Sequence, residues 1–287
     1  MSSTLIQVIA GGLLLGAVYA LFSSGLTMIW GMMNVVNFAH GDFVMLGMYV
    51  AFAVWTLTGG GPVAAVPIAA VLLAGLGVFG YFVLIRHIMR GPMLAQILGT
   101  FGLALLLRYS ALWYFGTRFQ TLPENLVGGT LTIGPLRIEA SRLLAGAVAL
   151  AVTAGLHLII TRTAIGSRML AVAEDATAAE LMGIRPERMQ AIAWGLAAAA
   201  TGIAGALIAN FFYVAPTVGE TLAIIAFVTV SLGGFGSVPG ALVAGLLIGV
   251  IESLSAYMIG PVYKDIAVYA LFVLALWLRP QGLMGKA

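Results

Sequence analysis

Long apolar runs separated by short polar stretches dominate the pattern along this chain of 287 residues. A helix needs about 20 apolar residues, each adding a rise of about 1.5 Å, to cross the hydrocarbon core of a bilayer. Eight runs come close to that length. The pattern therefore predicts membrane-crossing helices over residues 5–22, 42–57, 63–85, 93–115, 142–160, 189–212, 239–256 and 266–278.

Two further apolar pieces, residues 26–33 and 221–232, are shorter and run into the turn-prone stretches "NVVNFAHGD" and "GGFGSVPG". Backbone that leaves a helix at membrane depth must be buried in protein or line a wet cavity, because lipid satisfies none of its polar groups. Interrupted segments at corresponding positions of two halves indicate a transport pathway. We therefore predict two broken, re-entrant half-helices in two related halves, with ordinary surface loops as the alternative.

The polar and glycine residues of these two breaks are the candidate pathway residues. Helix ends and side-chain amides offer the dipoles that a zwitterion needs while it crosses an apolar interface. Asn34 and Asn37 are the expected pathway-facing dipoles, whereas Asp42 is expected to cap a helix that begins at Phe43, with Gly41 in its turn. The complete set is Asn34, Asn37, His40, Gly41, Asp42, Gly233, Gly234 and Gly236.

Composition supports the membrane assignment. Hydrophobic residues make up 62% of the chain and charged residues 8%, with a mean hydropathy of +1.10, whereas roughly a quarter of the residues in a soluble domain are charged. The chain is therefore predicted to be an all-α polytopic membrane protein, with residues 1–287 forming one transmembrane domain. The first apolar run follows no basic stretch and is too long for a cleaved signal, so it is expected to be retained.

The polar residues exclude several functional classes. The 13 Lys and Arg residues are scattered through short loops and form no basic face for nucleic acid. There is no cysteine, and the three histidines are not at ligand spacing, so neither a metal nor a cofactor is expected. Without a GxxxxGK[ST] sequence or a paired nucleophile and base, the chain is not expected to be an enzyme. Any ATP hydrolysis is expected on separate subunits.

The basic residues also predict an orientation, because cytoplasmic loops carry an excess of Lys and Arg. One side of the predicted helices carries more of them than the other, and Arg108 falls within a helix. The richer side is expected to face the cytoplasm. It holds Arg86, Arg90, Arg162, Arg168, Arg185, Arg188, Arg279 and Lys286, against Arg118, Arg137, Arg142 and Lys264.

Residues 161–190 form a polar segment on the cytoplasmic side. Within it, "DATAAELMGI" predicts a short helix capped by Asp175 and ended by Gly183, and Pro186 permits a new helix just afterwards. A solvated loop has no need of the apolar Leu181 and Met182 beside that glycine. The pattern therefore favours a helix that docks into a groove on a partner.

Two glycine pairs, in "GLLLG" (Gly12 and Gly16) and "GLLIG" (Gly245 and Gly249), each lie one helical turn apart. Such pairs let another helix approach closely. Packing inside a single subunit is expected here.

An ion-coupled secondary transporter, with His40 and Asp42 carrying protons, is the rival class. Ionisable groups at membrane depth are functional suspects because each costs about 2.5–3.5 kcal/mol to insert. Besides these two, only Arg108 and Glu252 lie near that depth, and both are expected toward the outer ends of helices, where long side chains reach water. A proton relay needs more groups, and a passive channel would leave the docking segment unexplained.

Four stretches together resemble one family of transport proteins: "GLTMIWGMMNVVNFAHGDF", "GSRMLAVAEDATAAELMGI", "GGFGSVPGALVAGLLIG" and "LRPQGLMG". In this order, over nearly the whole chain, they resemble the shorter of the two permeases of branched-chain amino acid ABC importers. The resemblance implies a multi-pass subunit of a bacterial inner (plasma) membrane that pairs with a second, homologous permease. It also implies two cytoplasmic ATPase subunits and a periplasmic or lipid-anchored substrate-binding protein.

The resemblance assigns a role to the segment 161–190, because in such importers a short cytoplasmic helix of the permease sits in a cleft of the ATPase. The family's "EAA" spelling is kept loosely here, as "AAE". The residues that fall on this coupling loop are Glu174, Asp175, Ala178, Ala179, Glu180 and Gly183.

The implied substrate is a branched-chain or other hydrophobic amino acid, although members of the family also transport urea and short amides. High-affinity recognition is expected in the binding protein, so the pathway through the permeases is expected to be weak and unselective.

Overall fold

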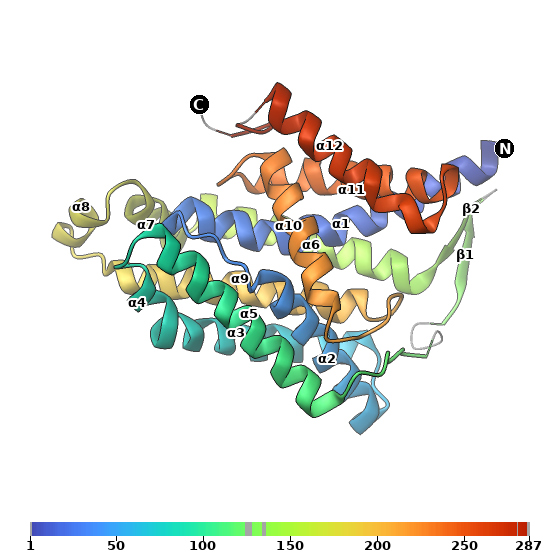
Figure 1. The fold of residues 1–287 in the computed structure, drawn as a ribbon, viewed down its shortest axis with the longest axis horizontal. Coiled ribbons are helices and arrows are strands. Elements are labelled where there is room, and N and C mark those ends of the chain that lie inside the picture. Colours follow the sequence, from blue (N-terminus) through green and yellow to red (C-terminus); the bar gives the residue numbers. More distant parts are fainter. Residues whose placement is uncertain (1, 124–127, 134–135, 280, 286–287) are drawn as a thin grey trace.

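The computed structural model describes residues 2–123, 128–133, 136–279 and 281–285. Most helices run along the long axis of the molecule, and a small β-hairpin lies at one end (Figure 1). Among the described residues, seven helical segments are long and apolar enough to cross a membrane, which confirms the predicted all-α polytopic fold. They are α1 (Ser2–Met33), α2 (His40–Thr58), α3 with its continuation (Val63–Ile88), α5 (Met93–Phe115), α6 (Ala140–Arg162), α9 (Pro186–Ile208) and α11 (Val238–Met258).

The remaining elements are shorter. Helix α3 itself is Pro62–Gly80 and continues through a π-helical turn, Tyr81–Ile85, into α4 (Arg86–Ile88). Helices α7 (Ala164–Glu174) and α8 (Ala176–Leu181) form one end of the molecule. Helices α10 (Val218–Gly233) and α12 (Lys264–Leu278) have 16 and 15 residues, fewer than a full crossing needs. The strands β1 (Thr130–Ile133) and β2 (Leu136–Glu139), which the sequence did not predict, pair antiparallel, and a 3₁₀ turn covers Pro261–Tyr263.

Only one of the two predicted half-helices is present as a separate element. Residues 221–232 lie in the short helix α10, as expected. Residues 26–33 instead continue α1, an unbroken helix of 32 residues. The glycine before them, Gly25, does not break the helix, because its missing side chain admits α9: a Cβ there would lie 3.0 Å from the carbonyl oxygen of Ala197.

The two predicted glycine pairs meet each other. Helices α1 and α11 pack closely along their length, and a Cβ on Gly12 would lie 2.7 Å from the carbonyl oxygen of Gly249. A Cβ on Gly16 would lie 2.5 Å from that of Gly245. The "GLLLG" and "GLLIG" motifs therefore join the first and a late helix of the same subunit.

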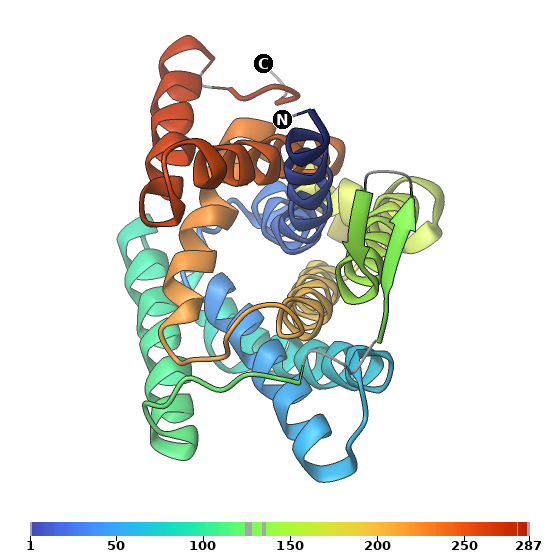
Figure 2. The ribbon, with the colours of Figure 1, turned by 90° about the vertical axis from the view of Figure 1, so that its right-hand side faces the viewer.

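Helix α9 lies inside the bundle, in contact with α1, α2, α3 and α6 (Figure 2). Small residues let its neighbours approach: a Cβ on Gly47 of α2 would lie 2.6 Å from the carbonyl oxygen of Gly202, and one on Gly202 would lie 2.7 Å from that of Ala69 in α3. Trp194 is fully buried on the same helix. The core is therefore built from backbone contacts as much as from large side chains.

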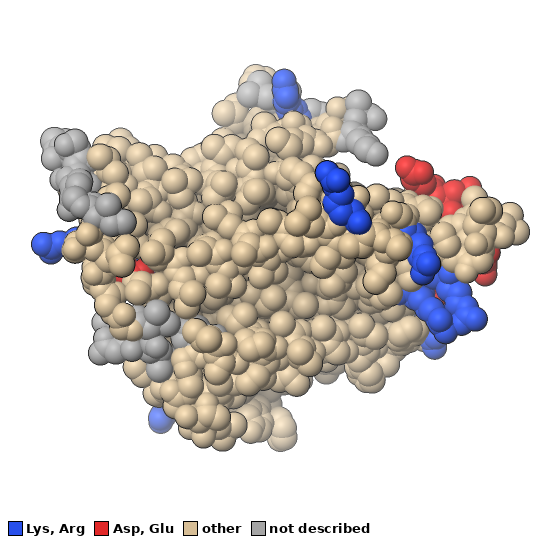
Figure 3. Space-filling model, turned by 180° about the vertical axis from the view of Figure 1, so that it is seen from behind, with Lys and Arg blue, Asp and Glu red and all other residues tan. Residues whose placement is uncertain are grey.

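Charged side chains are sparse on the middle of the surface that Figure 3 shows. On the face seen in Figure 3, an extensive uncharged surface separates the two ends, and most of the visible Lys, Arg, Asp and Glu side chains gather at the end formed by α7 and α8. This distribution suits a molecule that crosses a bilayer with α7 and α8 on the more charged side.

Candidate functional site

The segment between α1 and α2 turns back into the bundle. Asn34 closes α1 in a left-handed conformation, φ +52°, which residues other than glycine rarely adopt. The chain then returns so far that the Nε2 atom of His40 lies 2.7 Å from the carbonyl oxygen of Phe22, well before the end of α1. Helix α2 therefore begins beside Phe22 of α1, inside the protein.

Polar groups of this segment are bound by the segment itself and by α5. The Oδ1 atom of Asn37 accepts a 3.1 Å hydrogen bond from the N–H of Ala39, and the hydroxyl of Thr100 donates to the carbonyl oxygen of Val36 at 3.0 Å. Asn37 is 1% exposed, whereas Asn34 is exposed. Of the two amides expected to face a pathway, only Asn34 is therefore accessible in this conformation.

Asp42 does not cap a helix beginning at Phe43, because α2 begins at His40 and already contains Asp42 in its first turn. Its fully buried carboxylate receives the guanidinium of Arg108 from α5, with Nε to Oδ1 at 3.1 Å and Nη2 to Oδ2 at 3.4 Å. The Nη1 atom of Arg108 also donates to Glu220 of α10 at 3.1 Å. We call Asp42, Arg108 and Glu220 the charged tie, since they join α2, α5 and α10.

The charged tie changes the interpretation of two groups. Arg108 was expected to reach water near the end of its helix, but its side chain is only 20% exposed and pairs with the buried Asp42 and with Glu220. His40 contacts a backbone carbonyl while Asp42 contacts a guanidinium. The two side chains thus have separate partners, which argues against a direct proton relay between them.

Two glycines allow α2 and α10 to approach closely at the charged tie. A Cβ on Gly219 of α10 would lie 2.7 Å from the Oδ1 atom of Asp42, and one on Gly41 would lie 2.8 Å from the Cα atom of Ala223. Helices α2 and α10 therefore cross in backbone contact, and larger residues at either glycine would separate Asp42 from α10.

The turn from α10 to α11 is the second predicted break. Gly234 and Gly236 adopt φ +99° and +80°, and the N–H of Gly236 donates to the hydroxyl of Thr27 in α1 at 2.8 Å. The turn is covered by residues near the C-terminus: the N–H groups of Leu283 and Met284 donate to the carbonyl oxygens of Leu232 and Gly233, at 2.8 and 3.0 Å. The turn is thus fixed to α1 and to the downstream chain.

The predicted pathway residues form two groups. Gly41 and Asp42 contact the first turn of α10, while Gly233 ends this helix and Gly234 and Gly236 follow it. Gly219, which Gly41 and Asp42 contact, precedes Gly233 by 14 residues, so at a rise of about 1.5 Å per residue the helix separates the groups by about 21 Å. The structure does not bring them into one cluster, but α10 connects them.

The segment 161–190 folds as the sequence predicted. Asp175 caps α8 by accepting hydrogen bonds from the N–H groups of Thr177 and Ala178, at 2.9 and 3.0 Å. Gly183 follows in the left-handed region, φ +81°. The N–H groups of Gly183 and Ile184 return to the carbonyl oxygens of Glu180 and Ala179, which is the Schellman arrangement.

The exposure of the coupling residues divides them. Leu181 and Met182 are 84% and 82% exposed, whereas Ala179 is 5% exposed and packs into the protein. The other residues of the predicted coupling set, Glu174, Asp175, Ala178, Glu180 and Gly183, are exposed. Two apolar side chains therefore project from a capped helix at the charged end of the molecule.

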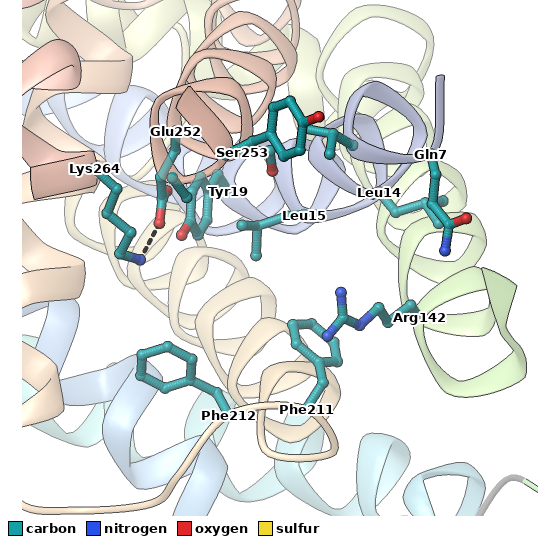
Figure 4. A pocket seen from close by; sticks show the side chains of 14 residues that line it. Gln7, Leu14, Leu15, Tyr19, Arg142, Phe211, Phe212, Glu252, Ser253 and Lys264 are labelled. Carbon is teal, nitrogen blue, oxygen red and sulfur yellow. Dashed lines mark hydrogen bonds and ion pairs between the residues drawn. The ribbon is translucent and has the colours of Figure 1, made fainter. Parts of the chain in front are cut away.

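A cavity of about 480 Å³ opens at the opposite end, and the sequence did not predict it. It lies between α1, α6, α11, the residues after α9 and the start of α12 (Figure 4). Glu252 and Lys264 form an ion pair on one wall, and Arg142 lies on the other side of the space. Glu252 was expected to reach water, but it is only 3% exposed. In the sequence, the only indication of this cavity was the single carboxylate of Glu252 inside an apolar run.

Comparison with known proteins identifies the family of this chain. The family described as "Branched-chain amino acid transport system / permease component" matches residues 8–276. BraD, a high-affinity branched-chain amino acid transport system permease protein of Pseudomonas aeruginosa, is 32% identical over 98% of this chain and 96% of its own. The corresponding LivH protein of Escherichia coli is 31% identical over the same shares, and the E. coli permease LivM is 27% identical over 93% of this chain and 68% of its own.

One solved structure shares the fold. PsaBC from Streptococcus pneumoniae, in complex with Fab, aligns with a TM-score of 0.53 and 10% identity over 98% of this chain and 97% of that one. The chain therefore belongs to the family of branched-chain amino acid transport system permease components and is a multi-pass membrane permease subunit.

Proposed function

We propose that this chain is one of two membrane-spanning subunits of an ATP-driven importer that carries branched-chain or other hydrophobic amino acids across the inner (plasma) membrane of a bacterium. The chain acts as a single domain, with residues 161–190 as its cytoplasmic coupling loop. A second, homologous permease completes the membrane part. Two ATPase subunits and a periplasmic or lipid-anchored binding protein supply energy and substrate. The match to amino acid permeases over nearly the full length supports this function.

Helix α8 is the feature that carries the coupling to an ATPase. Its ends are closed by Asp175 and by the turn at Gly183, so it keeps its shape when a partner pushes on it. Leu181 and Met182 offer apolar surface that an ATPase cleft would cover. A movement of the ATPase would then reach the membrane helices through α7 and α9, which lie on either side of α8.

Helix α10 is the element that would respond. It contacts α2 at one end and the α10–α11 turn at the other. Its short length leaves backbone ends within the protein, where they offer dipoles to a passing zwitterion. The pathway residues of both breaks, from Asn34 to Asp42 and from Gly233 to Gly236, would line the route between this chain and its partner permease.

Reconstitution tests this function directly. The complete complex in proteoliposomes should accumulate leucine only with ATP and binding protein, and dissipating the proton gradient should leave this accumulation unchanged. Accumulation driven by a proton gradient without ATPase subunits would overturn the proposal in favour of a secondary transporter. Urea or a short amide, offered as competitor, reports whether the substrate is instead a smaller amide.

A paired substitution tests the coupling helix. Changing both Leu181 and Met182 to Glu should release the ATPase subunits during purification and abolish uptake, while the melting temperature of the permease stays unchanged, because both side chains are exposed. Ser167→Glu, also exposed but on α7, is the matched control and should retain the ATPase. Full uptake by the paired variant would contradict the role given to α8.

A further inference from the structure

The cavity at the end opposite α8 contains a buried carboxylate with an unused oxygen. Glu252 is 3% exposed, and its Oε1 atom is paired with the ammonium of Lys264. Its Oε2 atom is buried and accepts no hydrogen bond of normal geometry from the described residues, although the Tyr19 hydroxyl lies beside this carboxylate at the cavity wall. A buried carboxylate oxygen without a donor is unfavourable, so the cavity wall offers a position for a further hydrogen-bond donor.

The same cavity holds positive charge for an anionic group. Lys264, whose ammonium pairs with Glu252, keeps 31% of its side chain exposed and lines the cavity. Arg142, 48% exposed, lies across the space (Figure 4). Its Nε pairs with Glu139 at 2.9 Å, and its guanidinium is 5.8 Å from the centre of the Phe211 ring, so a ligand carboxylate would share this arginine with Glu139. One carboxylate and two cations therefore surround a single space.

Much of the remaining lining is apolar, beside the polar groups of Gln7, Ser253 and two tyrosines, and the size is suitable. Leu14, Leu15, Phe211 and Phe212 contribute hydrocarbon surface. The volume of about 480 Å³ falls within the roughly 300–1,000 Å³ typical of small-molecule sites. A ligand with an ammonium, a carboxylate and an apolar side chain matches all three parts of the wall.

We propose that this cavity is a low-affinity site for the zwitterion of an apolar amino acid, in which the ligand inserts into the Glu252–Lys264 pair. The ammonium of the ligand pairs with the Glu252 carboxylate, and the carboxylate of the ligand pairs with Lys264 and Arg142. The net charge of the cavity does not change, because the ligand is neutral overall. This inference rests on the proposed function for the identity of the ligand.

The position of the cavity suits a first stop on the way inward. A smaller cavity beside it shares Leu15, Tyr19, Phe212 and Lys264 and continues to Leu222 and Ile225 of α10. A ligand held by Lys264 would therefore lie next to the helix that we expect to move. Binding is weak because the ligand must displace an existing ion pair, which suits a site that passes its ligand on.

The absence of cysteine from the chain provides a direct test. Ser253 lines the cavity, so Ser253→Cys introduces a thiol that a charged methanethiosulfonate reagent labels in the complete complex. With a Kd of ~1 mM, ~10 mM leucine should slow this labelling roughly tenfold by mass action. Thr130→Cys on the exposed strand β1 is the matched control, and leucine should not slow its labelling.

Ligand variants separate the two charges. Isoamylamine and isovalerate each carry one of them and should protect Ser253→Cys less than leucine does, and isoamyl alcohol should not protect it. Protection by phosphatidylethanolamine in the nanodisc but not by leucine would assign the cavity to lipid and overturn the proposal. Equal labelling with and without leucine would overturn it too, provided that the complex takes up leucine.

Glu252→Gln completes the test. In the Ser253→Cys background it should remove most of the leucine protection and lower uptake, while the ATPase subunits stay bound. Unchanged protection would show that Glu252 does not hold the ammonium. Should the wild-type complex fail to transport any amino acid, the proposed function fails. Transport of leucine without protection of the cavity defeats only the site.

Discussion

Asp42 and Glu252 are both carboxylates buried among membrane-crossing helices, yet they are satisfied to different degrees. Both oxygens of Asp42 accept from one guanidinium, which comes from α5 and also contacts α10. Only one oxygen of Glu252 has a partner among the described residues. A planar guanidinium matches two carboxylate oxygens at once, whereas an ammonium is a single compact charge.

This difference distinguishes a carboxylate with a structural role, Asp42, from one that we expect to bind a ligand, Glu252. At Asp42 the charge is neutralised by a fixed partner between packed helices, and a ligand has nothing to replace. At Glu252 the partner is a flexible, partly exposed lysine beside an open cavity. The degree to which a buried charge is satisfied is therefore more informative about function than its burial.

Arg108→Leu should produce the largest effect. It leaves the Asp42 carboxylate buried without a partner, and breaking a buried pair in this way costs about 3–5 kcal/mol. Thermal unfolding of the purified permease should show a large loss of stability, while Arg118→Leu, an exposed arginine, should show almost none. The double variant with Asp42→Leu should recover much of the loss. A double variant no more stable than Arg108→Leu would contradict the charged tie.

Lys264→Met should have an intermediate effect. It leaves Glu252 without a partner, but water in the cavity can reach the carboxylate, so we expect a loss of about 1–3 kcal/mol. Adding Glu252→Gln should restore most of the stability in the same unfolding measurement. The comparison fails if Lys264→Met destabilises the protein more than Arg108→Leu does.

Glu220→Gln should have the smallest effect. The Glu220 side chain is 67% exposed, and exposed pairs contribute about 0–1 kcal/mol. The stability should therefore change as little as it does in Glu187→Gln, whose carboxylate forms an exposed pair with Arg90. A large loss would mean that Glu220, rather than Asp42, carries the stabilising interaction of the charged tie.

Features set by neighbouring residues could be predicted from the sequence. Asp175, Gly183 and Pro186 act within one or two turns, and each has its expected role at a helix end. The apolar runs predicted the membrane-crossing helices because burial in lipid depends on local composition. The Gly12 and Gly245 motifs indicated close packing, although not that each packs on the other.

Features set by helix packing could not be predicted. Asp42, Arg108 and Glu220 lie far apart in the sequence, so their contact depends on how α2, α5 and α10 meet. The cap expected from Asp42 was wrong because α2 already begins at His40 and contains Asp42 in its first turn. Residues 26–33 were expected as a separate half-helix but continue α1, because Gly25 serves close packing against α9 rather than a turn. The cavity around Glu252 depends on five separate segments.

The backbone bonds from Leu283 and Met284 to Leu232 and Gly233 also have a consequence during synthesis. The carbonyl groups at the end of α10 leave the ribosome about fifty residues before the N–H groups that pair with them. Until then the end of this helix has no backbone donors from that part of the chain. A chain that stops before Leu283 therefore lacks these two donors, and the end of α10 is completed only when synthesis of the whole protein is almost finished.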